Sequence, residues 1–265
     1  MRKTSALSYL LLSSLAVFLI SSCQKEPSTD SSPETNCLLV KTHYFDYVGA
    51  LADSLEYTYI NDKLMKASNV GGYITFEYTN EKITKRNYYA TGSTDLDAYD
   101  IATYNTDGSL AIIKSYFNFN GQIMPSEQYE FNYANGKLVK FELKDYNSNT
   151  SQFELNESTT YTYTGNNITQ SVSITAGTSE IDTSNYSHDD NENYLVKINA
   201  LFADLAFVGG LNGETIPLLL SVNNVTKVFE GNDEYLLTYK LDSKNNFFEW
   251  HLDGDLASRY FYDCK

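Results

Sequence analysis

Histidine is scarce in this sequence, with 3 residues in 265, and cysteine is equally scarce, with 3. His43, His188 and His251 are not spaced like the His-x-x-x-His pairs that bind metals, and no two cysteines form a CxxC pair. A G-x-S-x-G nucleophile elbow and a phosphate-binding glycine loop are missing as well. We therefore expect no catalytic residue, no metal and no cofactor. The three histidines are interpreted as structural, His188 in a polar turn and the other two in strands.

Positive charge is also scarce. The chain holds 19 Lys and Arg against 34 Asp and Glu, a formal net charge of −15. A field of this sign repels phosphate backbones and anionic lipid head groups. We therefore do not expect nucleic acid as a partner. The negative charge is interpreted as an aid to solubility, with capture of cations as the alternative.

Apolar runs long enough to span a bilayer are missing too. The run Leu10–Ile20 follows two early cations and is about half of the roughly 20 residues that a spanning helix needs. A charged start, a short apolar stretch and the small residues Ser21 and Ser22 are the parts of a secretory signal peptide. We therefore expect residues 1–22 to be a leader that is removed.

A cysteine stands directly after those small residues. The run Leu19-Ile20-Ser21-Ser22-Cys23 resembles the bacterial lipobox. This resemblance implies that Cys23 is lipidated and becomes the first residue of the mature chain. The expected partner at this end is therefore a membrane, held through several acyl chains, because a single chain binds only marginally.

Residues 23–36 are expected to form a flexible tether. After Cys23 the segment has no apolar residue, two prolines and many hydroxyl groups, so it cannot bury surface. Its start, Gln24-Lys25-Glu26, resembles the export signal of Bacteroidota surface lipoproteins. That resemblance implies an outer-membrane lipoprotein exposed on the cell surface, with a periplasm-facing orientation as the second choice.

Two cysteines remain in the mature chain, one near each end. Cys37 and Cys264 would meet the oxidising compartment of an exported protein, where thiols of this kind form disulfides. We predict a single Cys37–Cys264 bridge, with two unpaired thiols as the alternative. Residues 37–265 are expected to form one domain.

From Cys37 onward an alternating aromatic run, a polar turn and an apolar residue recur. Period-two alternation of aromatic and β-branched residues indicates strands, and Asp-Gly or Asn-Gly pairs favour tight reversals. Neighbouring strands should therefore be antiparallel. We expect an all-β domain, a long meander of about 14–18 strands. The clearest copies are Tyr57–Leu64, Phe76–Ile83, Tyr104–Leu110, Tyr129–Leu138 and Tyr161–Ile168.

These units resemble the YD repeats of the Rhs family. Tyr104-Asn105-Thr106-Asp107-Gly108-Ser109-Leu110 is the nearest copy. The chain also resembles a family of Bacteroidota lipoproteins of unknown function built from divergent YD-like hairpins, over roughly Leu55–Tyr262. Rhs proteins wrap such hairpins into a hollow shell. Because eight units are too few for a closed shell, we expect a curled open sheet.

One segment, Tyr194–Leu220, departs from the alternation. Its aliphatic residues recur at three- and four-residue spacing, which predicts a short helix near Asn199–Phe207. We interpret the segment as a helix and loop that plug the curled sheet, and therefore expect Leu205 to be buried. The alternative is an exposed patch that meets a partner.

Tyrosine is abundant, with 23 residues, and acidic pairs occur where turns are expected. Tyrosine on an outer face can stack on sugars or contact proteins, although repeat packing explains it more simply. The sequence therefore favours a non-enzymatic binding or scaffold module for a glycan or protein ligand. The alternative is a glycan-degrading enzyme, which needs two facing carboxylates.

The acidic pairs are interpreted as solvated side chains of turns. Two acidic clusters, at residues 95–100 and 189–192, could hold calcium. The pairs are Asp95/Asp97, Asp189/Asp190, Asp233/Glu234 and Asp253/Asp255.

Overall fold

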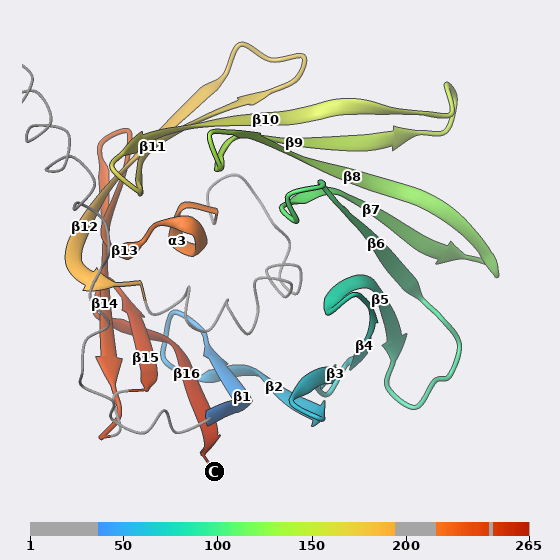
Figure 1. Cartoon of the computed structure of the whole chain (residues 1–265), viewed down its shortest axis with the longest axis horizontal. Coiled ribbons are helices and arrows are strands. Elements are labelled where there is room, and N and C mark those ends of the chain that lie inside the picture. The colour runs from blue at the N-terminus through green and yellow to red at the C-terminus, as the bar shows by residue number, and fades with distance from the viewer. Residues whose placement is uncertain (1–36, 194–215, 244–245, 265) are drawn as a thin grey trace, which may run out of the picture. The chain divides into compact units, whose positions relative to one another are not determined.

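A computed structural model describes residues 37–193, 216–243 and 246–264 of the chain. These residues lie in one compact unit, Cys37–Cys264, and form 16 strands and one five-residue helix (Figure 1). The prediction of an all-β fold is therefore confirmed. Among these residues, no helix is both long and apolar enough to cross a membrane.

The strands follow one another along the chain, and the connection between β12 and β13 is the longest. Their bounds are β1 (Cys37–Phe45), β2 (Leu51–Ile60), β3 (Lys63–Ser68), β4 (Gly72–Thr79), β5 (Lys82–Ala90), β6 (Ala98–Tyr104), β7 (Leu110–Phe119), β8 (Gln122–Ala134), β9 (Lys137–Asn147), β10 (Gln152–Thr164), β11 (Asn167–Thr175), β12 (Ile181–Glu192), β13 (Asn223–Glu230), β14 (Asp233–Leu241), β15 (Phe247–Leu252) and β16 (Asp255–Cys264). The helix is α3 (Ile216–Leu220).

The sheet closes into a barrel, so the prediction of a curled open sheet is wrong. Each strand pairs antiparallel with its neighbours in the chain, and β1 pairs with β16. At this β1–β16 seam, Cys37 lies opposite Cys264 and Thr42 lies opposite Tyr260. Closure pairs the backbone groups that two open edges would leave exposed. The hairpin count therefore suffices for a closed ring.

The hairpins repeat one local geometry. Asn61 and Asp62 reverse the chain with positive φ, and Asn135 and Gly136 do the same farther along the sheet. The pairing register then shifts by one residue beside the unit's tyrosine, which marks a β-bulge. The shift recurs at Tyr59, Tyr78, Tyr104, Tyr133 and Tyr163.

Three of these tyrosines, Tyr78, Tyr104 and Tyr163, donate a hydrogen bond to a backbone carbonyl of the preceding hairpin. The Tyr78 hydroxyl donates to the Leu64 carbonyl at 2.8 Å, and the Tyr163 hydroxyl donates to the Leu138 carbonyl at 2.9 Å. Burial, followed by the charge of the neighbouring Tyr133, raises the pKa of Tyr163 to about 12, so its hydroxyl keeps its proton. Lys137 of the preceding hairpin lies 5.1 Å from the centre of the Tyr163 ring. Repeat packing therefore explains the tyrosines at these positions of the hairpins.

Apolar side chains gather in two core clusters. One joins β7 to β13 around Phe141, Leu138 and Ile168. The other joins β1 to β5 with β15 around Leu39, Phe76 and Phe247, with partly buried residues of β14 and β16 packed against it. Burial of this apolar surface is the main stabilising contribution to such a fold.

The helix α3 belongs to the first of these clusters. Ile216 and Pro217 are buried, and Leu218 and Leu219 pack against the cluster. Figure 1 shows α3 within the ring of strands. The helix predicted near Asn199–Phe207, and with it Leu205, lies outside the described residues.

Candidate functional site

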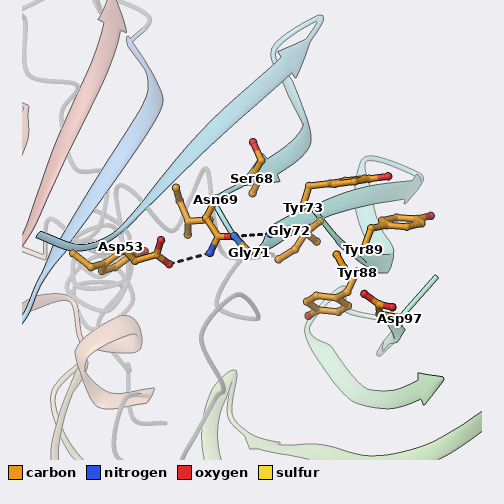
Figure 2. A pocket seen from close by; sticks show the side chains of 14 residues that line it. Asp53, Ser68, Asn69, Gly71, Gly72, Tyr73, Tyr88, Tyr89 and Asp97 are labelled. Carbon is orange, nitrogen blue, oxygen red and sulfur yellow. Dashed lines mark hydrogen bonds between the residues drawn. The ribbon is translucent and has the colours of Figure 1, made fainter. Parts of the chain in front are cut away.

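A cavity of about 710 Å³ lies against β1 to β5 and the β5–β6 loop (Figure 2). We call it the β1–β5 cavity. Its apolar wall consists of Leu55, Ala67 and Ile74, which belong to or pack against the second core cluster. Its remaining lining is mostly aromatic, polar or glycine: Tyr44, Asp53, Ser68, Asn69, Gly71, Gly72, Tyr73, Tyr88, Tyr89, Ala90 and Asp97.

The β3–β4 turn shapes one side of this cavity. The Asn69 Oδ1 atom accepts hydrogen bonds from the backbone N–H groups of Gly71 (3.0 Å) and Gly72 (2.9 Å). At Gly72 a Cβ atom would lie 2.2 Å from the Tyr89 carbonyl oxygen, so only glycine allows this close approach of β4 and β5. The sequence therefore fixes a tight turn whose amide side chain faces the cavity.

Asp53 is the half-buried carboxylate of the site. Its Oδ2 accepts a hydrogen bond from Asn69 Nδ2 at 3.0 Å, and its Oδ1 accepts one from the Ser54 backbone N–H at 2.7 Å. Figure 2 shows Asn69 between Asp53 and Gly72, with dashed lines to both. A second carboxylate, Asp97, is exposed on the β5–β6 loop, and its backbone N–H donates to the Tyr88 carbonyl at 2.9 Å.

Two of the lining tyrosines are held as neutral groups. The Tyr88 hydroxyl donates to Asp100 Oδ2 at 2.7 Å, and the same carboxylate forms a buried ion pair with Arg86. Burial raises the pKa of the Tyr88 hydroxyl, so it remains a donor. Burial also raises the pKa of Tyr44, and the negative charge of Asp53 adds to that rise. Both rings therefore meet the cavity as neutral aromatic groups.

His188 and Ser221 form an arrangement that resembles a nucleophile and a base. The His188 Nε2 atom lies 3.2 Å from Ser221 Oγ, which also accepts the Ile168 backbone N–H at 3.2 Å. Burial lowers the pKa of His188, and the charge of Asp189 opposes this change. However, Ser221 is fully buried, so no substrate reaches its hydroxyl. The pair anchors the residue after α3, and His188 lies in β12 and not in the predicted turn.

The other two histidines lie in strands, as predicted. The His43 ring packs edge-on against Phe261, with ring centres 4.8 Å apart. The His251 Nε2 atom lies 3.1 Å from Glu249 Oε2. Burial alone would raise the pKa of Glu249, but hydrogen bonds from Arg259, Lys240 and His251 lower it. These four side chains form a network of ion pairs and hydrogen bonds across neighbouring strands.

The acidic pairs do not assemble a metal site in the described ranges. No group of three or more His, Cys, Asp or Glu side chains there is placed to hold an ion. Asp189 lies in β12 and not in a turn, and it accepts hydrogen bonds from Asn191 and Asn224. Glu234 pairs with Lys227 at 2.6 Å.

Of the predicted site residues, the structure brings together Cys37 and Cys264. Their sulfur atoms are joined in a disulfide, and their Cα atoms lie 4.0 Å apart across the seam. Cys23 lies outside the described residues. The sequence interpretation missed Asp53, Asn69 and the other residues of the β1–β5 cavity. One sequence signal could have revealed this cavity. The turn Asn69-Val70-Gly71-Gly72 does not follow the recurring pattern of an aromatic run, a polar turn and an apolar residue.

Comparison with known proteins identifies no family. No family model matches the chain, and no curated protein matches it. Among solved structures it is similar to a porin-like protein from Bacteroides uniformis, with 13% identity, a TM-score of 0.45 and coverage of 89% of this chain and 94% of that chain.

Two further structural similarities have lower scores. A DUF3836 family protein from Bacteroides vulgatus shares 12% identity, with a TM-score of 0.30 over 32% of this chain and 90% of that chain. The Photorhabdus luminescens Tc holotoxin pore shares 11% identity, with a TM-score of 0.34 over 79% of this chain and 9% of that chain. None of these similarities assigns a family or an activity to this chain.

Proposed function

We propose that this chain is a non-enzymatic, lipid-anchored envelope protein that binds a small glycan in the β1–β5 cavity. The observation that carries this proposal is the composition of the cavity. Tyrosine rings, an apolar wall and the hydrogen-bonding groups of Asp53 and Asn69 meet in about 710 Å³. Ligand pockets in proteins commonly measure about 300–1,000 Å³ and combine apolar walls with a few placed polar groups. Sugars need both kinds of surface, because their ring faces stack on aromatic groups while their hydroxyls need partners.

The cavity favours a small ligand over a protein partner. Its walls come from five adjacent strands and one loop, and Gly72 allows the close packing of β4 and β5 at its side. Small-molecule sites in proteins are concave, so a cavity of this kind suits a small ligand. A protein ligand is therefore treated as one outcome of the binding experiment.

The first experiment uses the aromatic wall. Full-length protein, purified in detergent, is screened on an array of neutral and amino-sugar oligosaccharides. Tyr44→Ala should weaken binding of the best oligosaccharide by about tenfold, because it removes an aromatic contact in the pocket. Isothermal titration calorimetry measures the change.

The matched control is Tyr47→Ala. Tyr47 is 88% exposed in the β1–β2 turn and is not among the lining residues, whereas Tyr44 is 36% exposed. The control should bind like the wild type. If both substitutions weaken oligosaccharide binding equally, or if neither changes it, the ligand binds outside this cavity. An array without any signal, together with capture of a protein from intact cells, would favour the protein ligand.

A hydrolytic role has one observation in its favour. Asp53 and Asp97 both line the cavity, and glycan hydrolysis uses two carboxyl groups, one of them with a raised pKa. We prefer binding because aromatic and apolar side chains supply much of the cavity lining. Release of shorter products from a bound oligosaccharide, abolished in Asp97→Asn, would replace this proposal with hydrolysis.

The envelope location rests on the N-terminal sequence. We propose that residues 1–22 are a leader, that residues 23–36 tether the domain of residues 37–265, and that the protein faces the outside of the outer membrane. The same proposal includes a relationship to YD repeats. The recurring aromatic run, polar turn and apolar residue supports it. The acidic net charge supports a partner other than nucleic acid.

The anchor has its own test. Cys23→Ala removes the thiol that would carry the lipid, so the protein should leave the membrane fraction or remain as the uncut precursor. Fractionation with immunoblotting measures both. If the variant still sediments with membranes at its processed size, another anchor holds it. Protease shaving of intact cells then distinguishes the surface from the periplasm.

A further inference from the structure

The charge of the β1–β5 cavity narrows the class of ligand, on the basis of the glycan-binding function proposed for it. Among the fourteen lining residues, Asp53 and Asp97 are charged, and both are acidic. Lysine, arginine and histidine do not occur in that lining set. A cavity of one sign raises the local concentration of ions of the opposite sign. A neutral sugar would gain nothing from this field, whereas a cation would.

Asp53 is half-buried and lacks a cationic partner within the described ranges. Its hydrogen-bond partners, Asn69 Nδ2 and the Ser54 backbone N–H, are neutral groups. The two carboxylates that are buried in the described part of the chain, Asp100 and Glu249, are compensated by cations. Asp100 pairs with Arg86, and Glu249 pairs with Arg259 at 2.7 Å. Because withdrawing a charge from water is unfavourable unless it is paired, the site at Asp53 favours an incoming cation.

The tyrosine rings add a second attraction for positive charge. A cation over an aromatic face is stabilised by the negative potential of the ring. Two lining tyrosines already show this contact with groups of the protein. The Lys66 Nζ atom lies 4.3 Å from the Tyr73 ring centre, and the Arg86 guanidinium carbon lies 5.5 Å from the Tyr88 ring centre. Tyr44 lies opposite Asp53 in the pairing of β1 with β2, so its ring stands beside the carboxylate.

We infer that the β1–β5 cavity takes an amino sugar or a similar small polyhydroxylated ligand whose protonated amine donates to Asp53 and packs beside Tyr44. Asp97, an exposed residue of the lining, adds negative charge to the cavity, and Asn69 holds the Asp53 carboxylate in place with its hydrogen bond. The sugar ring then contacts the apolar wall of Leu55 and Ile74.

Two disaccharides of matched shape test this inference. The glucosamine dimer carries amines that are protonated at slightly acidic pH, whereas the N,N′-diacetylated dimer is neutral. Calorimetric titration of the full-length protein should show binding of the glucosamine dimer that is about 10- to 100-fold tighter than that of the acetylated dimer, as one charge-assisted hydrogen bond provides. Added salt should reduce the difference.

Substitution at Asp53 assigns the effect to the cavity. Asp53→Asn should remove most of the preference for the amine. The control Asp190→Asn removes the same charge from an exposed position on β12, outside the lining, and should keep the preference. Equal loss in both variants would show a diffuse effect of net charge and would overturn the inference.

The two proposals fail in different ways. If the acetylated dimer binds as tightly as the glucosamine dimer, the preference for a cation is wrong and glycan binding stands. If neither dimer binds, the amino-sugar assignment is overturned, and the array with Tyr44→Ala and Tyr47→Ala decides glycan binding separately.

Discussion

Removing the seam disulfide should destabilise the barrel more than truncating a side chain in either core cluster. The double variant Cys37→Ser/Cys264→Ser frees two ends that are 227 residues apart in sequence. The chain-entropy model assigns about 5 kcal/mol to a loop of this length, as an upper figure. The melting temperature should then fall by about 10–20 °C for a domain of this size. Circular dichroism melts of the purified protein measure the change.

The physical reason lies in the position of the bond. Cys37 and Cys264 face each other across β1 and β16, the pair whose partners are farthest apart in the chain. Losing the bond therefore opens the longest loop that a cross-link between two strands of this sheet can close, and this raises the entropy of the unfolded chain. A reducing agent should reproduce the shift in the wild type and leave the double variant unchanged. Overlapping melts of the oxidised wild type and the variant would show that strand pairing alone holds the seam.

Phe141→Ala should have the second largest effect, a loss of about 3–5 kcal/mol in the free energy of unfolding. Phe141 on β9 is fully buried in the first core cluster. Its ring centre lies 5.5 Å from that of Phe131 and 6.1 Å from that of Tyr129. Truncation leaves a cavity among side chains that strand pairing holds in place, so the cavity cannot fully collapse. Urea unfolding followed by fluorescence measures the loss.

Phe119→Ala is the matched control for this variant. Phe119 lies at the end of β7 and is 57% exposed, so the same substitution should change the free energy of unfolding by less than about 1 kcal/mol. If the two variants lose the same stability, the burial of Phe141 is not what stabilises the cluster.

Local features of the fold could be predicted from the sequence because they depend on neighbouring residues. Asn135-Gly136 gives a turn with positive φ, and the alternation before it gives β8. Closure could not be predicted in this way, because β1 and β16 pair across the whole domain. The two cysteines at the ends of that pair were the available signal, and they predicted a bond without indicating a ring.

The cavity could not be predicted from the sequence pattern either, because its residues are brought together by strand pairing. Asp53 and Asn69 lie 16 residues apart, and they meet because β2 and β3 pair and the β3–β4 turn reverses the chain at Gly71 and Gly72. His188 shows the opposite error. A polar run predicts a turn from composition, but Tyr186 beside it is buried on the same strand, and tertiary packing extends β12 through the histidine.

Hydrogen–deuterium exchange with and without the oligosaccharide selected on the array tests glycan binding in the β1–β5 cavity most directly. Slower exchange is expected in the backbone amides around Asp53, across the turn Asn69–Gly72 and in Tyr88–Asp97, with β9 to β13 unchanged. These segments line the cavity although they are separated in sequence. Protection confined to β9–β13, or no protection at a saturating concentration of that oligosaccharide, would contradict the assignment of this cavity as the binding site.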